Sequence, residues 1–143
     1  MSSIRDFMSL HHRDCDGLFT DVENSVAASR WDKATAQWPL FLKELFHHFE
    51  MEERVLFPRF EQETGMTDGP TAMMRMEHDQ MRSVTESLAA AMSKQDRPAF
   101  LGLAESMMVL LQQHNMKEEQ ILYPMTDRAL SDVAEVLDSM KNV

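Results

Sequence analysis

Two stretches of the chain, HHFEMEERVLFP at residues 47–58 and QHNMKEEQILYP at residues 113–124, follow one pattern. Each contains His-x-x-x-Glu-Glu-x-(Val/Ile)-Leu-(Phe/Tyr)-Pro, and the second copy begins 66 residues after the first. A histidine and a glutamate four positions apart lie on the same face of an α-helix. The repeat therefore predicts two helices that each present an imidazole and a carboxylate in the same direction.

The sequence around these stretches is helical in pattern. Apolar residues recur at steps of three and four, and no stretch alternates as a half-buried strand does. We predict four long helices and a short C-terminal one, over about residues 2–28, 30–63, 70–94, 97–126 and 131–141. The predicted fold is all-α: an antiparallel up-down four-helix bundle, with its core over about residues 4–127, in a single domain of residues 1–143.

Some helix boundaries can be assigned to particular residues. Asp96 and Pro98 are typical of the start of the fourth helix, and Ser131 is predicted to cap the C-terminal one. We expect kinks or breaks at the three prolines within or at the ends of the helical patterns, Pro39, Pro58 and Pro124.

Each long helix has one stripe that is predicted to face the core. The stripes comprise Ile4, Met8, His12, Cys15, Phe19, Val22 and Val26; Phe41, Leu45, His48, Glu52 and Val55; Met74, His78, Met81, Thr85, Leu88 and Met92; and Leu103, Met107, Leu111, His114, Glu118 and Ile121. Every stripe is mainly apolar but contains one histidine, and two of them contain a glutamate one turn later. Burying a carboxylate among apolar side chains is costly unless it is paired or bound to a metal.

The spacing of these histidines indicates two similar helical hairpins. His12 and His48 are 36 residues apart, as are His78 and His114. Such hairpins bring four histidines and two glutamates to the same depth of the bundle. Six ligands of this kind suit two metal ions, and imidazole with carboxylate favours Fe, Mn or Zn over Mg or Ca. Glutamates from opposite helices can bridge the ions, which leaves two histidines for each ion and open coordination positions.

These motifs resemble those of the bacterial hemerythrin-like HHE cation-binding domains. The resemblance rests on HHRDCDGLF around His12, HFEMEERVLFP from His48, EHDQMR around His78 and HNMKEEQILYP from His114. It implies a four-helix bundle around a non-haem di-iron centre with oxo or hydroxo and carboxylate bridges, and Zn or Mn as substitutes. The implied ligands are His12, His48, His78 and His114, with Glu52 and Glu118 as the bridging residues.

The chain departs from the oxygen-carrying members of that family at two places. Those proteins have a second histidine four residues after the one on the third helix, where this chain has Arg82. Their last bridging acid is an aspartate five residues after its histidine, whereas Glu118 follows at four. The pattern is more similar to di-iron proteins that repair iron centres under nitric oxide stress, although those carry an additional cysteine-bearing domain.

The remaining polar residues near the stripes have simpler interpretations. We expect His47 to be solvated and His11 to lie at the stripe edge, with neither a ligand. Glu53 and Glu119 point away from the ligand face and are expected at the surface or paired with the ligands. Because Tyr123 takes the place of Phe57 in the other repeat, we expect it to pack rather than to take part in chemistry. Cys15 is expected to be a small core residue, with metal-catalysed oxidation as the alternative.

Composition restricts the class of partner. The net charge of −10 and pI near 4.9 argue against nucleic acid or an anionic membrane. No apolar run approaches the roughly 20 residues that span a bilayer, and the N-terminus lacks the apolar segment of a signal peptide. A single cysteine fits a reducing compartment, so we expect a cytoplasmic protein.

The functional hypothesis is a di-iron protein that binds or reacts with O2, NO or H2O2, in oxidative or nitrosative stress or in iron handling. One alternative is a metal-stabilised interaction or iron-storage module without turnover, for which the C-terminal helix is a docking or dimerisation element. A further alternative is a bundle that binds adventitious zinc.

Overall fold

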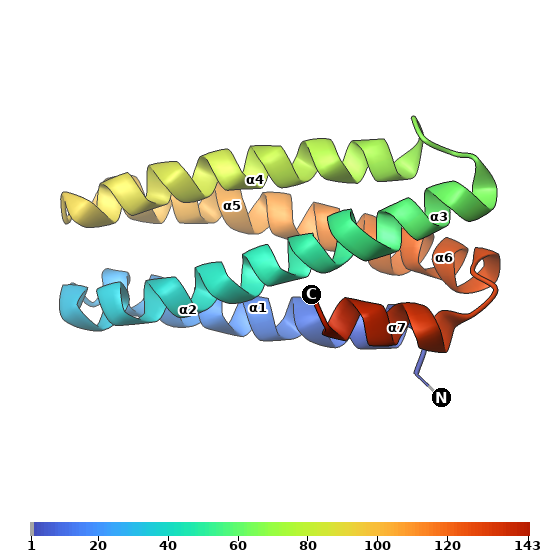
Figure 1. Ribbon diagram of the computed structural model, residues 1–143. Coiled ribbons are helices and arrows are strands. Elements are labelled where there is room, and N and C mark those ends of the chain that lie inside the picture. The colour runs from blue at the N-terminus through green and yellow to red at the C-terminus, as the bar shows by residue number, and fades with distance from the viewer. Residues whose placement is uncertain (1) are drawn as a thin grey trace.

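The computed structural model describes residues 2–143, and helices account for most of them (Figure 1). In chain order the helical segments are α1 (Ile4–Ala27), α2 (Trp31–Glu50), η1 (Met51–Leu56), α3 (Phe57–Thr64), α4 (Pro70–Ser93), α5 (Arg97–Lys117), η2 (Glu118–Leu122), α6 (Tyr123–Ala129) and α7 (Val133–Lys141). The segments η1 and η2 are π-helical. Among the described residues, no helix combines the length and hydropathy that a membrane span requires.

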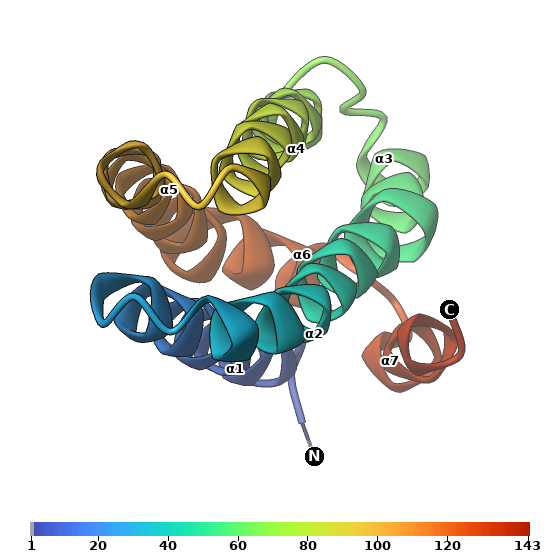
Figure 2. The same ribbon diagram turned by 90° about the vertical axis from the view of Figure 1, so that its left-hand side faces the viewer.

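The helices form an antiparallel bundle, as predicted. The segments α2, η1 and α3 follow one another without a loop and form one long helical rod, and α5, η2 and α6 form another. Helices α1 and α4 are the other two of the four rods. In the end-on view α1 lies beside α2 and α4 beside α5 (Figure 2). The short α7 packs on the outside of the bundle in the half that holds the N-terminus, and the chain ends near mid-length (Figure 1).

The start of α5 confirms its predicted cap, whereas the start of α7 corrects the cap predicted there. The Asp96 carboxylate accepts a hydrogen bond from the Ala99 N–H at 3.1 Å and caps α5 as predicted. The cap of α7 is Asp132, which accepts from the Glu135 N–H at 3.1 Å, so the prediction of Ser131 was wrong. Because α7 begins one residue later than expected, Ser131 lies outside the capping position.

The prolines interrupt the helices less than expected. Helix α2 continues through Pro39. Before Pro58 and Pro124 the chain widens into the π-helical segments, in which the Phe57 N–H donates to Glu52 O and the Tyr123 N–H donates to Glu118 O, five residues back. Proline lacks an N–H and its ring clashes with the carbonyl one turn earlier. A π turn accommodates that clash without ending the helix.

The apolar core consists of two clusters with a polar layer between them. One cluster lies toward the α1–α2 and α4–α5 loops and includes Phe19, Trp38, Phe41, Leu88, Phe100 and Met107. The other lies toward the N-terminus and the α3–α4 loop and includes Ile4, Met8, Phe57, Phe60, Leu122 and three residues of α7, Val136, Leu137 and Met140. The predicted histidines and glutamates lie along the helices between these clusters.

Most of the predicted stripes are buried, but the π turns shift the register after each glutamate. Ile121 was predicted to be in the core and is 57% exposed, whereas Leu122 is 2% exposed. Similarly, Val55 is only partly buried and Leu56 is fully buried. A π turn places residue i+5 rather than i+4 above residue i, so the buried positions move one residue along the chain.

An ion pair connects α3 to α4 across the loop between them. Glu61 accepts two hydrogen bonds from the Arg75 guanidinium and one from the Thr71 hydroxyl. Helix α3 ends at Gly65, whose φ of +74° is the left-handed conformation that glycine adopts without strain. This loop carries the chain from the second rod to the third.

Candidate metal centre

The structure brings the six predicted metal ligands together in one buried layer. His12, His48, His78 and His114 are each at most 4% exposed, and Glu52 and Glu118 are fully buried. Each long rod contributes to the layer, because the histidines lie on α1, α2, α4 and α5 and the glutamates lie in the first turns of η1 and η2. The sequence prediction of a shared depth is therefore confirmed.

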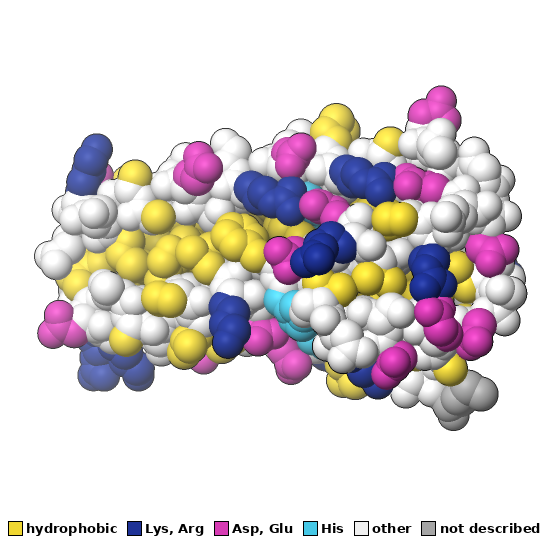
Figure 3. Space-filling view, viewed as in Figure 1, with side chains coloured by type: hydrophobic (Ala, Val, Ile, Leu, Met, Phe, Trp, Pro, Cys, Tyr) yellow, Lys and Arg dark blue, Asp and Glu magenta, His cyan; other side chains and the backbone are white. Residues whose placement is uncertain are grey.

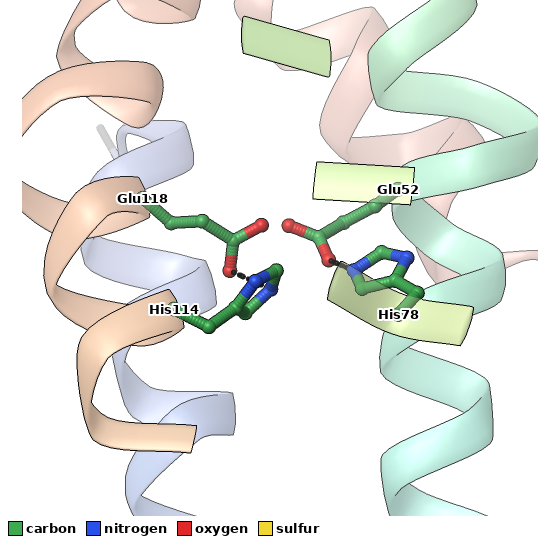
Figure 4. Close-up of side chains that lie close together, drawn as sticks. All are labelled: Glu52, His78, His114 and Glu118. Atoms are coloured by element: carbon green, nitrogen blue, oxygen red, sulfur yellow. Dashed lines mark ion pairs between the residues drawn. The ribbon is translucent and has the colours of Figure 1, made fainter. Parts of the chain in front are cut away.

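The two glutamates lie between the histidine pairs. Glu118 Oε1 is 3.0 Å from His12 Nε2 and 3.2 Å from His114 Nε2. Glu52 Oε1 is 3.1 Å from His78 Nε2 and 3.6 Å from His48 Nε2. In Figure 4 the two carboxylates face each other from opposite sides of the layer. Each carboxylate thus reaches one histidine of each helical hairpin, as a residue that bridges two ions must.

Three of the histidines are oriented by a second carboxylate at the far side of the ring. Nδ1 of His12 is 2.7 Å from Glu119, Nδ1 of His78 is 2.5 Å from Glu53, and Nδ1 of His114 is 2.8 Å from Glu77. An ionised carboxylate only accepts hydrogen bonds, so each Nδ1 carries the proton. When such a ring is neutral, its Nε2 directs a lone pair into the layer, which is the arrangement that metal-binding histidines use.

Only two of these three orienting carboxylates were recognised in the sequence. Glu53 and Glu119 were expected at the surface or paired with ligands, and the structure shows the pairing. Glu77 was missed, because it precedes its neighbour His78 along α4 but contacts His114 on α5. Among the described residues, Glu53 also accepts hydrogen bonds from Arg82, and Glu77 accepts one from Lys117.

Several buried polar atoms of the layer have no hydrogen-bond partner in the described residues. These are His48 Nδ1, Glu52 Oε1, His78 Nε2, His114 Nε2 and Glu118 Oε2. Some of them are close to an opposite charge, but the geometry is not that of a hydrogen bond. Unpaired buried polar atoms are costly. Metal ions bound to the Nε2 and carboxylate oxygen atoms among these would remove their cost, so the residues fit the metal site that the sequence predicts.

The spacing of the donor atoms also fits metal ions. Ligand atoms of Glu52, His78, His114 and Glu118 all lie within 4.8 Å of one another, and so do those of His12, His48 and Glu118. Glu118 belongs to both groups. The buried cluster is thus a candidate metal-ion site with two overlapping positions.

The buried charges shift one another's ionisation. Burial and the neighbouring Glu118 charge raise the pKa of Glu52 to about 7. Burial opposes protonation of His114, but the Glu118 carboxylate outweighs it and raises the pKa of His114 to about 9. Burial would likewise raise the pKa of Glu53, but hydrogen bonds from His78 and Arg82 lower it to about 2. The outer carboxylate is therefore ionised, while the inner pair shares protons with the histidines, and a bound metal ion would displace those protons.

Tyr123 takes part in the layer, which corrects the expectation that it only packs. Its side chain is fully buried, and its Oη atom lies 2.8 Å from Glu52 Oε2 and 2.9 Å from Glu118 Oε1. The same oxygen is 3.2 Å from His12 Nε2 and 3.3 Å from His48 Nε2. The π turn explains the error, because it aligns Tyr123 with Glu118 five residues earlier, a relation that α-helical spacing does not predict.

The other residues singled out in the sequence lie outside the layer. His11 is half-buried, with its ring 6.1 Å from that of His48, and His47 is half-buried rather than solvated. Cys15 is buried, and burial raises the pKa of its thiol to about 12, so it is a neutral core side chain.

Two surface cavities adjoin the layer, one on the α4–α5 face and one on the α1–α5 face. A cavity of about 360 Å³ between α4 and α5 reaches His114 and Glu77 and includes Met73, Met76 and Met81 in its lining. A second cavity, of about 350 Å³, reaches His12 and Glu119 and includes Arg5, Arg13 and Asp16. On the face seen in Figure 3, apolar side chains follow the border between α4 and α2, and charged side chains gather near mid-length.

Comparison with known proteins agrees with this geometry. The hemerythrin HHE cation binding domain matches residues 3–126. An uncharacterised hemerythrin-like protein of Schizosaccharomyces pombe is 29% identical over 133 residues, which are 92% of this chain and 63% of that protein. An uncharacterised protein of Mycobacterium tuberculosis is 30% identical over 98 residues, which are 64% of this chain and 36% of that protein. The chain thus spans between about a third and two thirds of these relatives. No solved structure matches it.

Proposed function

This chain belongs to the hemerythrin HHE cation binding domain family, and we propose that it holds two iron ions in its buried layer. The ligands are His12 and His48 for one ion and His78 and His114 for the other, with Glu52 and Glu118 shared between them. The observation that carries this proposal is the convergence of four histidines and two glutamates on one buried layer that lacks enough hydrogen-bond partners.

A bound iron pair supplies redox electrons and open coordination positions for O2, NO or peroxide. The surrounding residues create the conditions for that chemistry. The outer carboxylates hold the imidazole rings in one tautomer, and the two apolar clusters exclude bulk water from both ends of the layer. The cavity that reaches His114 is lined partly by methionines, which suits the entry of a small, weakly polar molecule.

We place this activity in the response to oxidative or nitrosative stress, or in iron handling, within the cytoplasm. The second candidate is a metal-stabilised interaction or iron-storage module without turnover. Helix α7 gives that candidate a specific basis, because it packs outside the four-helix core and forms an Arg59–Glu135 ion pair with α3. Mn or Zn in the same ligands would also favour the second candidate.

The test is the metal content of iron-reconstituted protein together with its near-ultraviolet and visible spectrum. The di-iron proposal expects two irons per chain and absorption bands that change on reduction and on addition of NO. His114→Ala removes one ligand and is expected to abolish those bands. His47→Ala is the matched control, because His47 lies on α2 next to a ligand but outside the layer.

The outcomes separate the candidates. Iron content with a spectrum that is insensitive to NO and to oxidants would indicate the storage or interaction module. If His114→Ala leaves both the metal content and the melting temperature unchanged, the proposed ligand set is wrong, since a metal bound only to the native state stabilises it.

A further inference from the structure

The two halves of the metal layer differ in one oxygen atom. Tyr123 Oη is within 3.3 Å of Nε2 of His12 and of His48, the histidines of one half. The residue at the matching register of the other half is Phe57, whose ring lies 5.8 Å from that of His78 and has no polar atom. The half that contains His12 therefore has a potential donor that the half containing His78 lacks.

The distances around this oxygen are those of neighbouring ligands. Donor atoms at about 2.1 Å from one ion lie about 3 Å apart when they are adjacent in its coordination sphere. Tyr123 Oη is between 2.8 and 3.3 Å from four such atoms, two imidazole nitrogens and one oxygen each of Glu52 and Glu118. The phenol oxygen is thus placed where it could add to the ligands of an ion held by His12 and His48.

The carboxylates that contact the histidine Nδ1 atoms also have different partners in the two halves. Beside His78 and His114, the carboxylates of Glu53 and Glu77 are each neutralised by a cation, Arg82 and Lys117 respectively. The other half has no such cation within ion-pair distance among residues 2–143.

In that half, His12 is the partner of Glu119 in an ion pair, and residues 2–143 offer it no second one. The position that matches Glu77 is occupied by His11, and Nδ1 of His48 has no partner in the described chain. The surroundings of the two ions are therefore electrostatically unequal, which a symmetric reading of the repeat does not predict.

We propose that the two metal positions are inequivalent, with Tyr123 as an additional oxygen ligand of the ion at His12 and His48. This inference rests on the proposed di-iron function. On binding, the phenol O–H bond breaks, its proton leaves to solvent, and a bond from the oxygen to the metal forms with no change in oxidation state. The ion at His78 and His114 keeps the open coordination positions, next to the methionine-lined cavity.

The experiment compares iron(III)-loaded wild-type protein with Tyr123→Phe. Tyr123 is the only tyrosine in the chain, so any phenolate-to-iron charge-transfer band must come from it. We expect wild-type protein to show resonance-enhanced phenolate ring vibrations under visible excitation. The Tyr123→Phe variant is expected to lose them completely while far-ultraviolet circular dichroism remains unchanged. Ring-deuterated tyrosine in the wild-type protein should shift the same vibrations, which tests the assignment even if the variant folds poorly.

The metal content distinguishes a failure of the proposed Tyr123 ligand role from a failure of the di-iron proposal. Two irons per chain without phenolate vibrations in the wild-type protein would overturn the ligand role of Tyr123 and leave the di-iron proposal standing. Failure of the wild-type protein to retain iron in its histidine layer would overturn both. Phenolate vibrations that persist in Tyr123→Phe would also overturn the inference, since no other tyrosine exists to cause them.

Discussion

Replacing Glu77 tests whether the outer carboxylates control metal binding. The Glu77 side chain is only 15% exposed, and its two oxygens lie 2.8 Å from His114 Nδ1 and 2.6 Å from Lys117 Nζ. Glu77→Gln retains an oxygen acceptor for the imidazole but removes its charge. A hydrogen bond to a charged group contributes about 1.5–3 kcal/mol and a neutral one about 0.5–1.5 kcal/mol. The midpoints of these ranges differ by about 1.25 kcal/mol, which corresponds to roughly eightfold weaker metal binding.

Glu77→Ala removes the acceptor entirely, so the imidazole can rotate or change tautomer. We expect a loss of metal affinity between about tenfold and a hundredfold, the range for residues that orient metal-binding histidines. The assay is competition with an iron(II) chelator under anaerobic conditions. Glu105→Gln is the matched control, because Glu105 is an exposed carboxylate on the same helix as His114, and it should change nothing. Unchanged affinity in a folded Glu77→Ala protein would refute the reasoning.

Three further predictions concern stability, measured by chemical denaturation. Phe49→Ala should lower the free energy of unfolding by about 3–5 kcal/mol, because Phe49 is 1% exposed, whereas Phe46→Ala at a 36% exposed position should cost much less. Asp132→Ala should cost about 1 kcal/mol as the loss of a helix cap, and an equal cost for Ser131→Ala would contradict the assigned cap. The guanidinium partner of Glu61 lowers the pKa of that carboxyl, so its stabilisation is present above the unfolded pKa and is lost as the pH falls through the folded one. Glu61→Gln should remove that part of the acid dependence, and an identical pH profile in both proteins would contradict it.

The helical bundle followed from local periodicity, and the shared depth of the six predicted ligands followed from that periodicity together with the equal spacing of the histidines in the two hairpins. Apolar steps of three and four specify which face of a helix is buried, and this information is carried by residues close together in the chain. A histidine with a glutamate one turn later on such a face stands out because buried charge needs a partner. Because both repeats contain this pattern, the buried layer was predicted in both hairpins, and the structure shows it in both.

The errors in the site trace to two kinds of information that a helical stripe does not contain. The π turns at η1 and η2 shifted the buried positions by one residue, which exposed Ile121 and brought Tyr123 into the layer. The orienting role of Glu77 depends on the contact between α4 and α5. Spacing along one helix cannot predict a partner on another helix.

What the sequence by itself determined is a bundle with a repeated set of buried histidines and glutamates, because helical periodicity is local and the cost of burying charge is general. What only the tertiary structure decided is which differences between the two repeats lie in the layer. The matched positions of the two halves hold Tyr123 against Phe57 and His11 against Glu77, and the importance of each difference appears only where side chains from four helices meet. The coordination environment of an ion is set by atoms within a few ångströms in space, and packing alone brings those atoms together.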